Sequence, residues 1–386
     1  MTDTELTLAS LIHPFSPEDF KRRHWEQSPL VIKREEPGYY HDLMTLAGFD
    51  DLLALPLRSP RLRILRKGDE VSVGSPGYVE DTYGQFQQGC TIALQFLQER
   101  VSSLARLCRA LAAELSATFQ VNAYLTPPDE QGLDTHYDTH DVFVLQIAGV
   151  KHWRLFNEAV RLPLPGQEMR PVSATQSDLI AEVDLYPGDA IYIPRGFGHD
   201  AVSVGSTSLH LTVGVRPITW AFVLLAAMEE AIERDPQLRE SLPVGFACGG
   251  EARVDAERRL AGLIETFGPH VDVPHMIENA AAVIARRTGA SLDRHLVDLT
   301  ATPDLRLDTR VRRRPTPSTF AVAGGKAELT FHGKTLRMPE FVSEDLEFIR
   351  GTGAFTPQDL PGNLDDPGRL VLVKRLVREG LLTIDA

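Results

Sequence analysis

Three potential metal ligands lie close together in the stretch THYDTHDVFV: His136, Asp138 and His140. Side chains two residues apart on a β-strand point to the same face, so His136 and Asp138 are expected to project together. A neutral imidazole and a carboxylate suit iron(II), manganese or zinc. This HxD triplet alone is weak evidence for a metal site, because it arises by chance on many surface strands.

A more specific motif follows in YPGDAIYIPRGFGHDAV, where Gly188, Pro194, Gly196 and His199 have the spacing G-x5-P-x-G-x2-H. Glycine and proline impose tight turns, which would bring His199 into the mouth of a barrel at a fixed angle. The spacing resembles the second sequence motif of the cupin double-stranded β-helix. With the HxD triplet it predicts a 2-His-1-carboxylate triad, which leaves positions on an octahedral iron(II) open for a bidentate 2-oxo acid and for dioxygen.

His140 is expected to line the pocket rather than to bind the metal. A four-ligand cupin would use an HxH pair and a later glutamate, whereas here Asp138 is the middle ligand and no glutamate follows at the proper place. A turn is also expected near Thr139. The alternative interpretation is that His140 only satisfies a local backbone group.

A 2-oxo diacid needs a cation near its far carboxylate, since that charge would otherwise be buried without a partner. The strand VKHWRLF, which follows an expected turn at Ala148-Gly149, places Lys151 on one face and Arg154 on the other. A lysine facing inward is costly unless it is paired, and a bound carboxylate would supply the partner. Alternation alone leaves open which of the two cations faces inward.

The stretch VNAYL puts Asn122 and Tyr124 on one face of an upstream strand. An amide and a phenol can hydrogen-bond to carboxylate oxygens. The two side chains are equally compatible with ordinary strand positions.

The elements that would position these side chains fall into three regions. Residues 1–216 combine short helices with β-rich runs that are punctuated by glycine and proline, the pattern of an antiparallel barrel or sandwich. In this region Ser16 is expected to cap a helix, a strand is expected to begin near Leu30, and the apolar spacing of TIALQFLQERVSSLARLCRALAAELSA predicts a helix or helix pair.

The other two regions differ from the first in composition and in hydrophobic periodicity. Residues 217–303 carry Ala-rich amphipathic helices, whose spare apolar face would suit oligomerisation; packing on the barrel fits the same periodicity. Residues 304–386 predict a small α+β module that resembles a winged helix, with hairpin turns at Gly324-Gly325 and Gly333, two helices and a final strand. The basic run TRVRRRP within it has two interpretations: a solvated linker, or a patch that attracts phosphates.

Composition sets further limits on function. The chain has 386 residues, and its formal net charge of −13 argues against extensive nucleic-acid-binding surface. Its three cysteines form no CxxC pair, which argues against a thiolate zinc site and a disulfide framework. No signal-peptide pattern and no apolar run of about 18–20 residues occurs, so we expect no membrane span and a cytoplasmic location.

The stretches TPPDEQGLDTHYDTHDVFVLQIAGVKHWRLF and LYPGDAIYIPRGFGHDAVSVGSTSLHLTVGV are together similar to the Jumonji C-type ribosomal oxygenases, which are iron(II)- and 2-oxoglutarate-dependent protein hydroxylases. FKRRHWEQSPLVIKRE resembles the N-terminal segment of the same family. The likeness is dense over about residues 10–216. It implies a mainly β catalytic domain (double-stranded β-helix, cupin/Jumonji C), followed by an α-helical dimerisation module and a small α+β winged-helix-like domain.

Position by position, the resemblance makes His136, Asp138 and His199 the iron ligands. It also makes Lys151 the partner of the distal carboxylate of 2-oxoglutarate, which would settle the orientation of that strand. The remaining residues that it assigns to the co-substrate pocket are Asn122, Tyr124 and His210. The chain departs from the family at Gly214, where a serine that assists co-substrate binding is expected in some relatives.

The resemblance further implies hydroxylation of an arginine or histidine side chain of a ribosomal protein, with iron(II), 2-oxoglutarate and dioxygen, by a homodimer that does not bind nucleic acid directly. Two alternatives remain open at this point. The oxygenase could act on another protein, a peptide, a tRNA base or a small molecule, or the chain could be a non-catalytic cupin-like binding or regulatory protein. A complete triad and Lys151 argue against the second.

Overall fold

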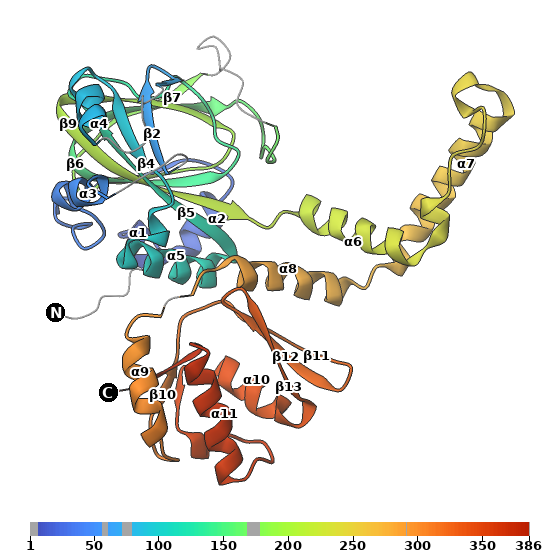
Figure 1. Ribbon diagram of the computed structural model, residues 1–386. Coiled ribbons are helices and arrows are strands. Elements are labelled where there is room, and N and C mark those ends of the chain that lie inside the picture. Colours follow the sequence, from blue (N-terminus) through green and yellow to red (C-terminus); the bar gives the residue numbers. More distant parts are fainter. Residues whose placement is uncertain (1–6, 56–60, 72–78, 168–177, 291, 386) are drawn as a thin grey trace.

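The computed structural model describes residues 7–55, 61–71, 79–167, 178–290 and 292–385. Figure 1 shows a β-barrel formed by the first half of the chain, a pair of helices that extends away from it, and a C-terminal α+β part on the far side of a connecting helix. No helix within these ranges is long and apolar enough to cross a membrane.

The barrel is built from nine antiparallel strands in the order β1-β8-β6-β9-β5-β4-β2-β3, with β7 paired to β6. This arrangement confirms the predicted mainly β domain. The strands are β1 Leu30–Ile32, β2 Leu62–Arg66, β3 Asp69–Glu70, β4 Thr91–Leu94, β5 Ala117–Thr126, β6 Asp141–Glu158, β7 Leu179–Leu185, β8 Ala190–Ile193 and β9 Phe197–Pro217.

The long central strands β6 and β9 are bent, and glycine makes the bend possible. The sequence predicts a turn at Ala148-Gly149, but β6 runs through these residues with shifts of register against β9. Gly149 has a φ of +65°, and a Cβ there would lie 2.0 Å from the carbonyl oxygen of Thr207. Only glycine fits this close approach of two backbones. One strand therefore carries both the pocket wall before Gly149 and Lys151 after it.

Short helices pack around the barrel: α1 Leu8–Ile12, α2 Pro17–Arg23, α3 Leu46–Leu53, α4 Val79–Gln87 and α5 Ser102–Leu115. The predicted cap is confirmed, because the Ser16 side chain accepts a hydrogen bond from the backbone N–H of Asp19. The prediction that residues 91–117 are helical is only partly right. Thr91–Leu94 form β4, whose side chains are all buried between β2 and β5, and α5 begins at Ser102. A short, fully apolar run cannot be assigned by periodicity alone.

The middle region contains α6 Trp220–Arg234, α7 Gly250–Phe267, α8 Val273–Arg287 and α9 His295–Ala301. Figure 1 shows α6 and α7, which we call the helical arm, extending away from the barrel. No residue of α7 is buried. The alternative that this region packs on the barrel fits α8, which lies between β5 and β12.

The C-terminal part has its own hydrophobic core and two three-stranded sheets. The elements are β10 Val311–Arg313, β11 Thr319–Ala323, β12 Lys326–Phe331, β13 Lys334–Pro339, α10 Ser343–Gly351, β14 Ala354–Phe355, α11 Asp366–Arg378 and β15 Leu382–Ile384. The predicted hairpin turns are confirmed at Gly324, Gly325 and Gly333, which all have positive φ. The winged-helix description stays a prediction.

The basic run TRVRRRP is not a linker, contrary to one of its two predicted interpretations. Its residues Val311–Arg313 form β10, in the middle of a sheet. Arg310 and Arg312 pair with Asp385, and the buried Arg314 pairs with Asp298 at 2.6 Å. Three of the four arginines in this run are thus paired with carboxylates.

Candidate metal centre and pocket

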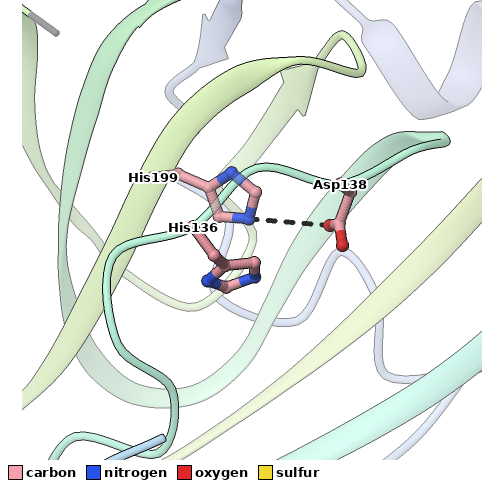
Figure 2. Close-up of side chains that lie close together, drawn as sticks. All are labelled: His136, Asp138 and His199. Carbon is pink, nitrogen blue, oxygen red and sulfur yellow. Dashed lines mark ion pairs between the residues drawn. The ribbon is translucent and has the colours of Figure 1, made fainter. Parts of the chain in front are cut away.

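Three of the predicted ligands converge (Figure 2). His136, Asp138 and His199 each offer a ligand atom, and these atoms all lie within 4.8 Å of one another. Nε2 of His199 is 3.6 Å from Oδ2 of Asp138. His199 belongs to β9, whereas His136 and Asp138 lie in the irregular segment before β6. The prediction that HxD belongs to a regular strand is therefore wrong, although the two side chains do converge.

Backbone hydrogen bonds orient both imidazoles toward this convergence. The Nδ1–H of His136 donates to the carbonyl oxygen of Asp134 at 2.7 Å, and the Nδ1–H of His199 donates to that of Phe197 at 3.1 Å. A carbonyl can only accept, so Nδ1 carries a proton in each ring and Nε2 is the atom that can bind a metal. Metal-binding histidines characteristically make this kind of outer hydrogen bond.

The protonation states also fit a divalent metal. Burial alone would raise the pKa of Asp138, but His140, His136 and His199 together hold that pKa below its ordinary value. Burial, with the neighbouring His136, lowers the pKa of His199 to about 4. At neutral pH the site thus offers the Asp138 carboxylate and a neutral His199 imidazole, the forms that bind metal ions. The residues fit iron(II) held by a facial 2-His-1-carboxylate set.

His140 lies at the wall of the pocket, where it is expected, and not with the three converging residues. Its ring packs over Gly214 of β9: a Cβ at that glycine would lie 2.8 Å from Cδ2 and 2.9 Å from Nε2 of His140. Thr212 and His210, two and four residues before Gly214, line the same pocket. The missing side chain at Gly214 therefore makes room for the imidazole, which explains the departure from the family at this position.

Lys151 faces inward, and this settles the alternative that strand alternation leaves open. Its side chain is 4% exposed, and its Nζ donates to Oγ1 of Thr126 at 3.0 Å and lies 3.5 Å from Nδ1 of His210. Among the described residues no carboxylate forms an ion pair with it, and burial lowers its pKa to about 7. A buried ammonium without a carboxylate is costly, and an anionic ligand would relieve that cost. Arg154 faces outward and pairs with Asp200.

The remaining predicted pocket residues line the same pocket as Lys151 and the metal site. Tyr124 stacks on His210 with ring centroids 5.1 Å apart, and burial raises the pKa of the Tyr124 hydroxyl, which stays protonated. Oδ1 of Asn122 accepts from Nε2 of Gln120 at 3.0 Å. Asn122, Tyr124 and His210 all line the pocket that contains the metal site.

Sequence reasoning misses Thr126, whose hydroxyl is the hydrogen-bond partner of Lys151. The signal was present, because the alternation that pairs Asn122 with Tyr124 also places Thr126 on the same face of β5. It also misses Trp153, which packs against His210 with ring centroids 5.6 Å apart and against His199 at 6.1 Å.

Residues 95–223, which contain the whole site, match the family model described as JmjC domain. These residues form a JmjC domain. The chain is 34% identical over 274 residues to Ribosomal oxygenase 1 of Gallus gallus. The alignment covers 64% of this chain and 44% of that protein. It is 30% identical over 302 residues to the "Bifunctional lysine-specific demethylase and histidyl-hydroxylase NO66" of Aedes aegypti, covering 72% of this chain and 47% of that one. It thus spans less than half of these relatives.

The JmjC-domain chain also shares its fold with solved structures. The X-ray structure of E. coli ycfD aligns with a TM-score of 0.60 at 19% identity, covering 96% of this chain and 98% of that chain. A structure of YcfD described as a ribosomal oxygenase from Escherichia coli in complex with cobalt and 2-oxoglutarate aligns with a TM-score of 0.54 at 18% identity, covering 97% and 99%. The resemblance to ribosomal oxygenases that the sequence motifs indicate is thereby confirmed.

Proposed function

We propose that this protein is an iron(II)- and 2-oxoglutarate-dependent oxygenase that hydroxylates a side chain, arginine or histidine favoured, of a ribosomal protein. One observation carries the proposal: a triad suited to iron(II) lines one pocket together with a buried lysine that has no carboxylate partner among the described residues. The names of the relatives, ribosomal oxygenase and histidyl-hydroxylase, support the substrate class. The YcfD complex with 2-oxoglutarate supports the co-substrate.

In this proposal His136, Asp138 and His199 hold iron(II), and Lys151 binds the distal carboxylate of 2-oxoglutarate. Bound iron(II) supplies the oxidative chemistry that couples decarboxylation of 2-oxoglutarate to hydroxylation of a C–H bond. The chain's own residues bind and orient the co-substrate. Thr126 holds the Lys151 ammonium in place, the protonated Tyr124 hydroxyl donates a hydrogen bond to the co-substrate, and Trp153 keeps bulk water from the space between them.

The pKa of Lys151 gives 2-oxoglutarate binding a defined pH dependence. The charged ammonium binds the carboxylate, and the free protein has a Lys151 pKa of about 7. The affinity for 2-oxoglutarate should therefore be highest below this pKa and should fall above it, by up to ~10-fold per pH unit. Isothermal titration calorimetry with Co(II)-loaded protein, from about pH 6.5 to about pH 8.5, would measure it. A flat profile would show that Lys151 is not the titrating partner.

The proposed chemistry can be tested by succinate formation. Purified protein with iron(II) and 2-oxoglutarate should release succinate, and ribosomal proteins should stimulate the release. Succinate without stimulation by ribosomal proteins would favour a peptide, another protein, a tRNA base or a small molecule as substrate. No succinate under any condition, from protein that retains no iron, would favour the non-catalytic cupin-like alternative.

We also propose that the chain comprises an oxygenase domain (1–216), a helical dimerisation domain (217–303) and a winged-helix-like domain (304–386). The helical arm supports a homodimer, because it exposes large apolar side chains that a monomer would leave in water. Examples are Trp220 (77% exposed), Leu225 (65%), Leu260 (59%) and Ile264 (67%). A ribosomal substrate would place the protein in the cytoplasm, and the net charge of −13 argues against direct nucleic-acid binding.

Charges introduced on the arm should separate the dimer. A Leu260→Glu/Ile264→Glu variant is expected to elute as a monomer in size-exclusion chromatography with light scattering, whereas the wild type is a dimer. Val371→Glu is the matched control, because Val371 on α11 is 67% exposed but lies outside the arm. Equal masses for the wild type and the arm variant would contradict this assembly.

A further inference from the structure

A buried carboxylate joins the two segments that carry the histidine ligands. Oδ1 of Asp200 accepts from Nε of Arg154 at 2.8 Å, and Oδ2 accepts from Nη2 of Arg154 at 2.7 Å and from the hydroxyl of Thr135. The Asp200 side chain is 1% exposed, whereas that of Arg154 is 43% exposed. We call Thr135, Asp200 and Arg154 the clasp.

Each member of the clasp is next in sequence to a residue that faces the metal site or the core behind it. His136 and His199 form an isolated β-bridge, and Arg154 is the cross-strand partner of Asp200 in the β6–β9 pair. Thr135 precedes His136, and Asp200 follows His199. Neighbouring residues on extended backbone point to opposite faces. The clasp therefore lies on one face of three adjacent segments, and the two imidazoles lie on the other.

The segment that carries His136 belongs to no strand and is joined to β9 at two places. Upstream, Gln131 forms an isolated bridge with Val202, and Ser203 N–H donates to Glu130 O at 3.1 Å. At the ligands, the backbone bonds are His136 N–H to His199 O (3.1 Å), His199 N–H to His136 O (2.7 Å) and Gly196 N–H to Asp138 O (3.0 Å). A slip of one residue against a strand turns every side chain to the opposite face. Such a slip would take His136 out of the metal site.

We propose that Asp200 is a positioning residue of the metal centre, which holds His136 and His199 at the separation that a metal ion requires through Thr135 and Arg154. The proposal rests on the proposed function, because it presupposes that the triad binds metal. A bidentate pair from Arg154 fixes the Asp200 carboxylate in the strand, and the hydroxyl of Thr135 ties the segment that carries His136 to it. The Asp200 carboxylate bonds to Thr135 and Arg154 and is not one of the three converging ligands.

The test is metal affinity measured apart from turnover. Co(II) would be titrated into purified metal-free protein and followed by its visible absorption, alongside thermal unfolding of the metal-free form. Thr135→Val and Asp200→Asn are expected to weaken Co(II) binding about 10- to 100-fold, as losses of outer hydrogen bonds to ligands do. Thr135→Ser keeps the hydroxyl and should restore wild-type affinity. A purely structural role would lower the unfolding temperature without moving the Co(II) affinity.

Asp184→Asn is the matched control. Asp184 pairs with His152 across β7 and β6 at 2.7 Å, two residues from Arg154 on the outer face, but joins no ligand-bearing segment. The Asp184→Asn variant should bind Co(II) with the same affinity as the wild type. If Thr135→Val and Asp200→Asn bind Co(II) as tightly as the wild type does, the positioning role of the clasp is wrong, whereas the proposed function is unaffected. A wild type that binds no Co(II) would overturn both.

Discussion

Asp138→Ala is expected to abolish iron binding and 2-oxoglutarate turnover, and His136→Ala is expected to do the same. Each change removes one of three protein ligands, and the carboxylate is the only anionic ligand of the converging set. The two ligands that remain in either variant bind iron(II) too weakly to retain it, because they form no facial triad. Iron content after dialysis and succinate release measure the two losses separately.

His41→Ala and Asp42→Ala are matched controls for these changes, because both residues are exposed and lie away from the pocket. They should retain wild-type iron content and turnover. Substantial activity of both Asp138→Ala and His136→Ala would show that the triad is not the metal site.

Lys151→Met is expected to raise the KM for 2-oxoglutarate about 10- to 100-fold. The loss of one hydrogen bond to a charged group corresponds to about 1.5–3 kcal/mol, and ~1.4 kcal/mol is a tenfold change in affinity. Iron content should be unchanged, because Lys151 lies outside the converging triad. Kinetics at saturating iron(II) would give the change, and an unchanged KM would show that another cation holds the carboxylate.

Lys151→Met should weaken 2-oxoglutarate binding without destabilising the ligand-free protein. The pKa of Lys151 is lowered from 10.5 in the unfolded chain to about 7 in the fold. The charged form therefore costs stability at every pH below 10.5, and that cost is complete below about 7. Methionine removes the cost, so Lys151→Met should unfold at the same or a higher temperature without ligand, yet lose the stabilisation that 2-oxoglutarate gives the wild type. Lys21→Met, on the exposed face of α2, is the control.

The metal triad could be predicted from sequence because its signals are local. Gly188, Pro194 and Gly196 set turns that deliver His199 to the barrel mouth, and His136 and Asp138 are two residues apart. Gly188 and Gly196 indeed have positive φ, and a Cβ on either would lie within 2.2 Å of a backbone carbonyl oxygen. The resemblance of both motifs to one family then supplied the domain order.

Other features depended on tertiary contacts that no local pattern contains. Lys151 and Arg154 are both cations on one strand, and only the closed barrel decides which faces inward. Thr91–Leu94 is apolar enough for a helix and becomes a strand because β2 and β5 flank it. The contact of His140 with Gly214 joins residues far apart in sequence, and so does the bond from Asp200 to Thr135.

The most direct test of the account is the mass of ribosomal proteins after reaction with this protein. Ribosomal proteins from a strain that lacks the gene would be incubated with the purified protein, iron(II) and 2-oxoglutarate, with Asp138→Ala as the control. The account predicts that one protein gains the mass of a single oxygen atom on an arginine or histidine, only with the wild type. Succinate release with no ribosomal protein changed in mass would contradict it.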